Sequence, residues 1–269
     1  MKPTTLFKGA TTRIVTAAML VSLALPGLSA QDPLAGTITY QQVLHYSFEN
    51  IERAHGDNQQ TQDWINSLPK EGITVQVLNF NSKLALFEED DSEKEATPDR
   101  LQRALMAESS LKPASPVVQK VYHDFDKNQR LEQLEYMTRI FLVQSEIEAV
   151  AWKLGSEKKK VLEYTCMNAT VTLDDQEIVA WFSPEIPVSL GPSFFGGLPG
   201  LILAVERNGE TAYVATSVKL SPPAEESIVK PDKGSKVTQE EFVAIQEEKE
   251  KERKENSQGE NSQGEFFHR

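Results

Sequence analysis

The stretch that decides the fold is SFFGGLPGLILAV, residues Ser193–Val205. It places four turn-forming residues, three glycines and one proline, directly before the apolar run Leu201–Val205. An apolar run of this kind has to be buried, so we expect Leu201–Val205 to form a central strand of a sheet. The preceding loop then has to bring the chain into the sheet at one fixed angle.

The loop itself, residues 183–200, is predicted to be stiff. Its prolines each fix one φ angle and remove one backbone donor; they are Pro184, Pro187, Pro192 and Pro199. The segment Leu198–Leu201 fits a type II turn, which would require a positive φ at Gly200. Gly196 and Gly197 allow the backbone to pass close to a neighbour. We therefore interpret residues 183–200 as a rigid corner.

Alternating apolar and polar residues predict further strands on both sides of this corner. Residues 37–48 read as a half-buried strand, and residues 73–87 as two strands with a bend at Asn79–Lys83. Asp174-Asp175 and Asn208-Gly209 mark tight turns. Residues 134–148 also fit a helix. The other expected strands are Val117–Phe125, Leu134–Val143, Ala149–Leu154, Val161–Leu173, Glu177–Phe182, Leu201–Arg207 and Thr211–Leu220. No long crossover helices alternate with these strands, so the fold is predicted to be mainly β, with an antiparallel sheet.

The chain divides into four parts by composition. Residues 1–30 have a basic start, a short apolar run and a small-residue cleavage site, as a signal peptide has. Residues 31–220 form the β domain, with a charged surface insertion at 88–116 that holds one short helix. Residues 221–254 are a linker and a charged helix, which a capping box of Thr238 and Glu241 begins. Residues 255–269, with the repeat ENSQG-ENSQG, are predicted to be disordered.

The charge and the single cysteine narrow the class of protein. The formal net charge of −12 becomes −15 when the three basic residues of the signal peptide are removed. An acidic chain without a basic cluster argues against nucleic acid and against anionic membrane surfaces. No second long apolar run follows the signal peptide, so we expect no transmembrane segment and a periplasmic or secreted location. Cys166 has no cysteine partner and is predicted to be a buried thiol.

Three motifs resemble the GLPGLI family of exported bacterial proteins: YTCMNATV (164–171), AWFSPEIPVSLGP (180–192) and GLPGLILAVE (197–206). The family hexapeptide is complete and consists of Gly197, Leu198, Pro199, Gly200, Leu201 and Ile202. Glu163 and Ser193 depart from the family pattern. The resemblance implies an exported protein with no established activity. By analogy with lipoprotein-localisation carriers, it also implies a curved, half-barrel-like sheet, to which the sequence itself adds one or two short helices and a C-terminal charged helix.

Four residues in the corner or just before it are candidates for a binding or structural role: Trp181, Glu185, Phe194 and Phe195. The aromatic side chains either pack in the core or serve as binding anchors on a rigid loop. Glu185 is expected to accept backbone N–H groups of its own loop. Alternatively, it acts as an acid together with a second carboxylate, for which Asp174 and Asp175 are the candidates.

The histidines show no metal-ligand spacing, so no metal and no cofactor are predicted. His45 and His123 could still meet on neighbouring strands. The residues assemble no convincing catalytic constellation. The first hypothesis is therefore a non-enzymatic binding or carrier-like protein of the bacterial envelope, whose partner is an envelope protein or an apolar ligand. The alternatives are an envelope hydrolase that uses Glu185, and an assembly module that binds a partner through its C-terminal helix.

Overall fold

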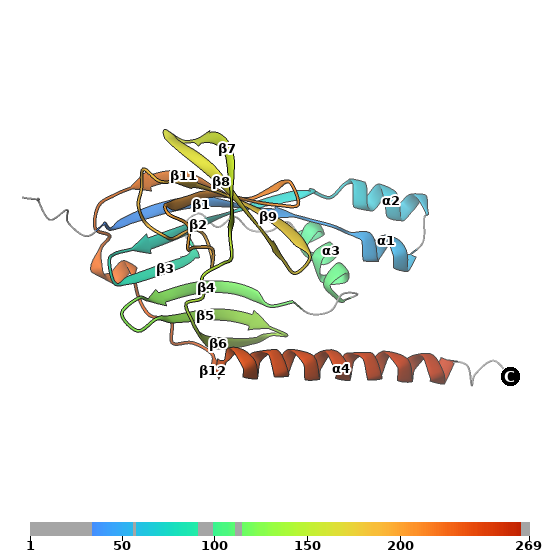
Figure 1. Ribbon diagram of the computed structural model, residues 1–269. Coiled ribbons are helices and arrows are strands. Elements are labelled where there is room, and N and C mark those ends of the chain that lie inside the picture. The colour runs from blue at the N-terminus through green and yellow to red at the C-terminus, as the bar shows by residue number, and fades with distance from the viewer. Residues whose placement is uncertain (1–33, 56–57, 91–98, 111–114, 265–269) are drawn as a thin grey trace, which may run out of the picture. The chain divides into compact units, whose positions relative to one another are not determined.

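The computed structural model describes residues 34–55, 58–90, 99–110 and 115–264, so the predicted signal peptide lies outside the described residues. In the described part, twelve strands form one sheet in the order β12-β6-β5-β4-β3-β2-β1-β11-β10-β9-β8-β7. Every pair of strands is antiparallel except β12 and β6. Figure 1 shows the strands with the helices beside them. This open sheet confirms the predicted mainly β, antiparallel fold class.

The strands are β1 (Gly36–His45), β2 (Glu71–Phe80), β3 (Leu84–Glu89), β4 (Val117–Asp124), β5 (Gln129–Tyr136), β6 (Arg139–Glu146), β7 (Lys153–Val161), β8 (Tyr164–Leu173), β9 (Gln176–Ser183), β10 (Leu201–Arg207), β11 (Glu210–Lys219) and β12 (Ser235–Thr238). The helices are α1 (Glu49–His55), α2 (Gln59–Asn66), α3 (Asp99–Ser110) and α4 (Gln239–Gly264), with a 3₁₀ turn at Glu225–Ser227.

The apolar run Leu201–Val205 begins β10, which lies inside the sheet between β11 and β9. All five of its residues are at most 3 % exposed. The corner before it covers the same region of the core, because Ile186 and Leu198 pack in one cluster with Leu201 and Ile202. The Tyr40 hydroxyl, fully buried, donates a hydrogen bond to the Ile202 carbonyl at 2.8 Å. The predicted role of this run as a buried central strand is confirmed.

The predicted type II turn at Leu198–Leu201 is wrong. Among the described glycines, positive φ occurs at Gly197, Gly209 and Gly234, and not at Gly200. Gly200 instead donates its backbone N–H to the Leu198 carbonyl at 2.8 Å, in a tighter turn around Pro199. Gly200 is required for space: a Cβ there would lie 2.2 Å from the Ser183 carbonyl oxygen, at the end of β9. The residue with the left-handed conformation is Gly197, with φ of 84°.

The strand predicted at Leu134–Val143 is in fact a hairpin. β5 ends at Tyr136 and β6 begins at Arg139, with Met137 and Thr138 between them at φ of 50° and 64°. The helix considered for residues 134–148 is also excluded. Neither turn residue is a usual choice for positive φ, so the sequence carries no turn signal at this place. A similar turn at Leu162, with φ of 53°, separates β7 from β8 inside the predicted strand Val161–Leu173.

After Leu220 the chain returns to the sheet through one more strand, β12. Residues 221–234 lead to β12, which pairs in parallel with β6, and α4 follows at once. Phe242 of α4 is 3 % exposed and packs on Tyr136 and Phe141. The capping box is present, since the Thr238 N–H donates to Glu241 Oε2 at 2.8 Å and the Glu241 N–H to Thr238 Oγ1 at 3.2 Å. The helix extends to Gly264, well past the predicted end near Glu255.

The insertion at 88–116 contains the expected short helix, α3. Its Leu101 and Ala104 are buried in a small cluster with Phe48, Ile51 and Ile65, which belong to the segment of α1 and α2. The insertion is therefore anchored by a second small core. In the described part of the chain, no helix is long and apolar enough to cross a membrane.

Candidate functional site

Trp181 is part of the packed interior. Its side chain is 7 % exposed, and its indole Nε1–H donates to Glu206 Oε1 at 3.0 Å. The Lys159 ammonium lies 4.2 Å from the centroid of the indole ring and also pairs with Glu206. Stacking on a cation and a satisfied N–H are what a buried tryptophan needs. Of the two roles considered for Trp181, the geometry favours packing.

Glu185 is exposed and holds the corner to the neighbouring strand. Its Oε1 accepts the backbone N–H of Thr165, on β8, at 3.0 Å, so the bond goes to the next strand and not to its own loop. Asp174 and Asp175 lie at the other end of the β8–β9 hairpin, because Leu173 pairs with Gln176 there. The carboxylates proposed as partners for Glu185 therefore do not meet it.

The corner does border a cavity, which we name the corner pocket. It has a volume of about 240 Å³ and is enclosed by three segments: the facing ends of β4 and β5, the connection after β6, and the corner itself. Its lining residues are His123, Phe125, Arg130, Ile147, Glu148, Ala149, Ser189, Leu190, Phe194, Phe195, Gly196 and Gly197. The half-buried Phe194 ring lies 4.5 Å from the ring of Phe195, which is buried. Two of the predicted site residues thus form one wall of this pocket.

Two basic side chains, His123 and Arg130, line the corner pocket from the sheet. His123 and Arg130 are direct partners in the β4–β5 ladder, so their side chains lie on the same face of the sheet. His123 is 7 % exposed and stacks on Phe125 at 6.0 Å. Burial, with a further contribution from the Arg130 charge, lowers the pKa of His123 to about 4. The imidazole is therefore neutral at physiological pH.

Arg130 is the positively charged group of the pocket lining, which also includes Glu148, and Arg130 pairs with Glu132. The Arg130 Nε lies 2.8 Å from Glu132 Oε1, although its buried N–H makes no hydrogen bond of good geometry. Burial raises the pKa of Glu132, and the Arg130 charge opposes that shift. The sequence leaves open that His123 meets His45 on a neighbouring strand. That pairing is wrong, because β3 and β2 separate β4 from β1.

The buried imidazole predicts a pH dependence of stability. His123 titrates near 6.5 in an unfolded chain and near 4 in the folded protein. Between these values the unfolded state binds more protons, so the free energy of unfolding falls as the pH is lowered from about 6.5 to about 4. We expect this loss to be about 3 kcal/mol. Urea denaturation at a series of pH values measures it. His123→Gln should remove this contribution to the pH dependence of the free energy of unfolding, and His45→Gln should retain it. An equal pH dependence in the two variants would contradict the assignment to His123.

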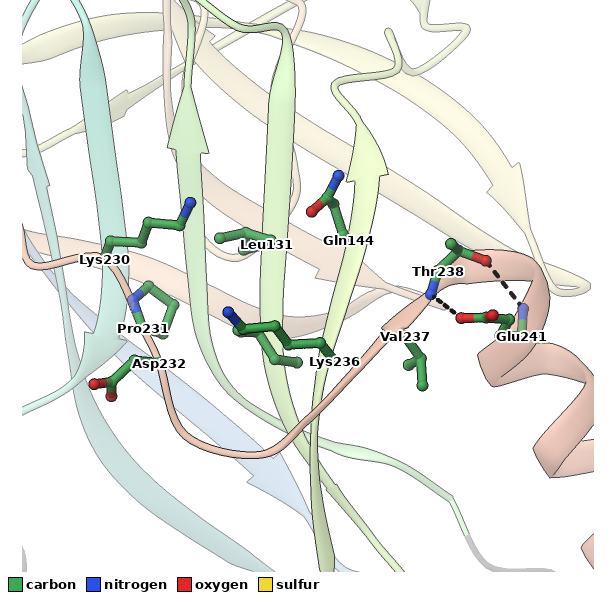
Figure 2. Close-up of a pocket in the computed structure, with 10 residues that line it drawn as sticks. Leu131, Gln144, Lys230, Pro231, Asp232, Lys236, Val237, Thr238 and Glu241 are labelled. Atoms are coloured by element: carbon green, nitrogen blue, oxygen red, sulfur yellow. Dashed lines mark hydrogen bonds between the residues drawn. The ribbon is translucent and has the colours of Figure 1, made fainter.

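A second, larger cavity of about 440 Å³ lies between the sheet and the segment 230–238, and we name it the strap pocket (Figure 2). Leu131 and Leu142 are the sheet residues at its floor, and both are 3 % exposed. The complete lining is Leu131, Leu142, Gln144, Lys230, Pro231, Asp232, Lys236, Val237, Thr238 and Glu241. The sequence predicts a linker and a helix start for most of these residues, and no pattern in it indicates this cavity.

The described residues contain no group of three His, Cys, Asp or Glu side chains placed to hold a metal ion. Cys166 is fully buried, and burial is the main cause that raises the pKa of its thiol to about 11. A thiol of such high pKa stays protonated and unreactive near neutral pH. Cys166 is thus the buried thiol that was predicted.

The chain is similar to one protein family and to several chains of known structure. Residues 109–242 match the family model described as the N-terminal domain of the N-glycanase peptide. Two structures of PNGF-II, in the space groups P21 and C2, align with TM-scores of 0.48 and 0.47, both at 16 % identity. They cover 79 % of this chain, whereas the chain spans about a third, 33 % and 32 %, of theirs. A search of curated proteins gives no match. The matched segment 109–242 holds β4 to β12, and with them both pockets.

Proposed function

We propose that this protein is an exported, non-enzymatic binding protein of the bacterial envelope that holds a small ligand in the corner pocket. The observation that carries the proposal is the meeting of the Phe194 and Phe195 rings with the buried His123 and the half-buried Arg130 in one cavity. An apolar wall with a few convergent polar groups is typical of small-molecule sites. The stiff corner keeps that wall in place before any ligand arrives, which lowers the cost of binding.

Further observations support export, and the position of Glu185 favours binding over hydrolysis. Residues 1–30 have the pattern of a signal peptide, and both the GLPGLI resemblance and the match to an N-glycanase domain agree with an exported bacterial protein. The proposed acid, Glu185, is held by Thr165 and lies away from Asp174 and Asp175. Binding therefore explains the geometry with fewer assumptions than hydrolysis.

Native mass spectrometry of the mature protein, purified from bacterial envelopes, tests the proposal. We expect a bound small molecule in the wild-type protein. Ala149→Trp should remove it, because Ala149 is an exposed residue at the pocket wall and an indole there fills the cavity. Ala151→Trp is the matched control, since Ala151 is exposed in the same connection and does not line the pocket. Bare wild-type protein, or equal occupancy in the two variants, would count against the proposal.

The family match favours a second candidate function, a recognition domain that accompanies glycan processing. The matched domain belongs to a protein named as an N-glycanase, and this chain spans about a third of the solved PNGF-II chains. Isothermal titration of the mature protein with an N-linked glycopeptide tests this candidate. Binding that Ala149→Trp abolishes would assign the glycan to the corner pocket, and the absence of heat at millimolar glycopeptide would reject the candidate.

The third hypothesis, an assembly module that binds a partner through α4, has less support than the two functions above. Phe242 and Ile245 dock α4 on the sheet through a small cluster. The helix carries mostly charged residues beyond them, so it presents no apolar stripe to a partner.

A further inference from the structure

The strap pocket combines an apolar floor with charged groups at its rim. Leu131 and Leu142 belong to a cluster with Leu86 and Tyr122, so the floor is fixed by the core behind it. Pro231 and Val237 add apolar surface from the strap, residues 230–238. A cavity of about 440 Å³ is within the usual range for organic ligands.

Two lysines extend over this floor. In Figure 2 the side chains of Lys230 and Lys236 both run toward the open space beside Leu131, from the two arms of the strap. Both residues are exposed. Lys230 makes one long contact, 3.5 Å, to Gln129 Oε1, and among the described residues Lys236 forms no ion pair. Their ammonium groups therefore have donor capacity left for a ligand.

Among the described residues, the two acidic groups of the lining form no direct ion pair with these lysines. The Glu241 carboxylate accepts the Thr238 N–H at 2.8 Å, as part of the helix cap, which fixes its position. Figure 2 shows the Asp232 carboxylate directed away from the space between the lysines. The ammonium groups of Lys230 and Lys236 are thus the charged groups directed over the apolar floor, while Asp232 and Glu241 balance them at the rim of the pocket.

We propose that the strap pocket binds a medium-chain fatty carboxylate. Its carboxylate lies between Lys230 and Lys236 and accepts charge-assisted hydrogen bonds from both. Its alkyl chain lies on Leu131 and Leu142, where it displaces water from apolar surface. The acidity of the rest of the protein disfavours an anionic bilayer surface, so the occupant is a single molecule in solution.

Isothermal titration of the mature full-length protein with octanoate tests this proposal. Octan-1-ol and octylammonium serve as the neutral and cationic probes with the same chain. We expect octanoate to bind at least about tenfold more tightly than octan-1-ol, and octylammonium not to bind. Equal affinity for octanoate and octan-1-ol would overturn the proposal, because it would show that the lysines take no part.

Variants of the strap assign the site. Lys230→Gln with Lys236→Gln should raise the Kd for octanoate about tenfold or more and leave the Kd for octan-1-ol nearly unchanged. Lys233→Gln is the matched control: it is an exposed lysine of the same strap that does not line the pocket, and we expect its Kd to stay within about twofold. A Kd that the double variant leaves unchanged would refute the site. Ala149→Trp should not alter octanoate binding. The proposals for the strap pocket and for the corner pocket are therefore tested independently.

Discussion

Replacing Gly200 with alanine should lower the free energy of unfolding by about 3 kcal/mol or more. A Cβ at this position would lie 2.2 Å from the Ser183 carbonyl oxygen, 2.6 Å from the Ser183 carbonyl carbon and 2.9 Å from the Pro184 nitrogen. All three are backbone atoms, so relief requires that the end of β9 and the start of β10 move apart. Overpacking that shifts backbone typically costs about 1–3 kcal/mol and occasionally more, and this site is among the tightest in the protein.

Urea denaturation of the protein, followed by circular dichroism, measures this effect. Gly209→Ala is the informative control, because Gly209 has φ of 83° and nothing within 4 Å of the added Cβ. Its cost should be about 1 kcal/mol, from backbone conformation alone. If Gly200→Ala cost no more than Gly209→Ala, the close approach of the two strands would not be a real constraint.

Replacing Trp181 with alanine should cost about 3–5 kcal/mol of stability, as is usual for a large buried aromatic side chain. The substitution leaves a cavity beside the core and removes both the ring under Lys159 and the donor to Glu206. Trp181→Phe keeps most of the volume and should cost clearly less. Circular dichroism during urea denaturation is again the measurement, since the change removes a fluorophore.

The same experiment decides between the two roles considered for Trp181. A binding anchor would be dispensable for folding, so a midpoint within error of the wild type would restore that hypothesis. Leu154→Ala is a suitable control on the edge strand β7, because Leu154 is 59 % exposed and its truncation should change little.

The sequence predicts the strands next to residues 183–200 well, because the signals that define them lie in neighbouring residues. The run Leu201–Val205 is too apolar to lie anywhere but inside, and Asn208-Gly209 has the left-handed conformations that a two-residue hairpin needs. The hairpin of β5 and β6 was missed because Met137-Thr138 turns the chain without Gly, Asn or Asp. Here strand pairing outweighs local preference.

The pockets depend on tertiary placement, which explains why they were only partly foreseen. Phe194 and Phe195 could be selected as candidates because they lie in a stiff loop. Arg130 becomes relevant only through the register that sets it opposite His123. The strap pocket exists because residues 230–238 return to β6, and the parallel pairing of a four-residue strand such as β12 has no signature in a single sequence.

The pairing of β1 with β11 sets a limit on how fast this chain can fold. Thr37 and Lys219 are partners near the middle of the sheet, so contacts there join residues from nearly opposite ends of the β domain. Closing loops of that length gives a high contact order, which slows folding in two-state proteins. Each half of the sheet can form separately from its own hairpins. The two halves can pair only after β11 has been synthesised.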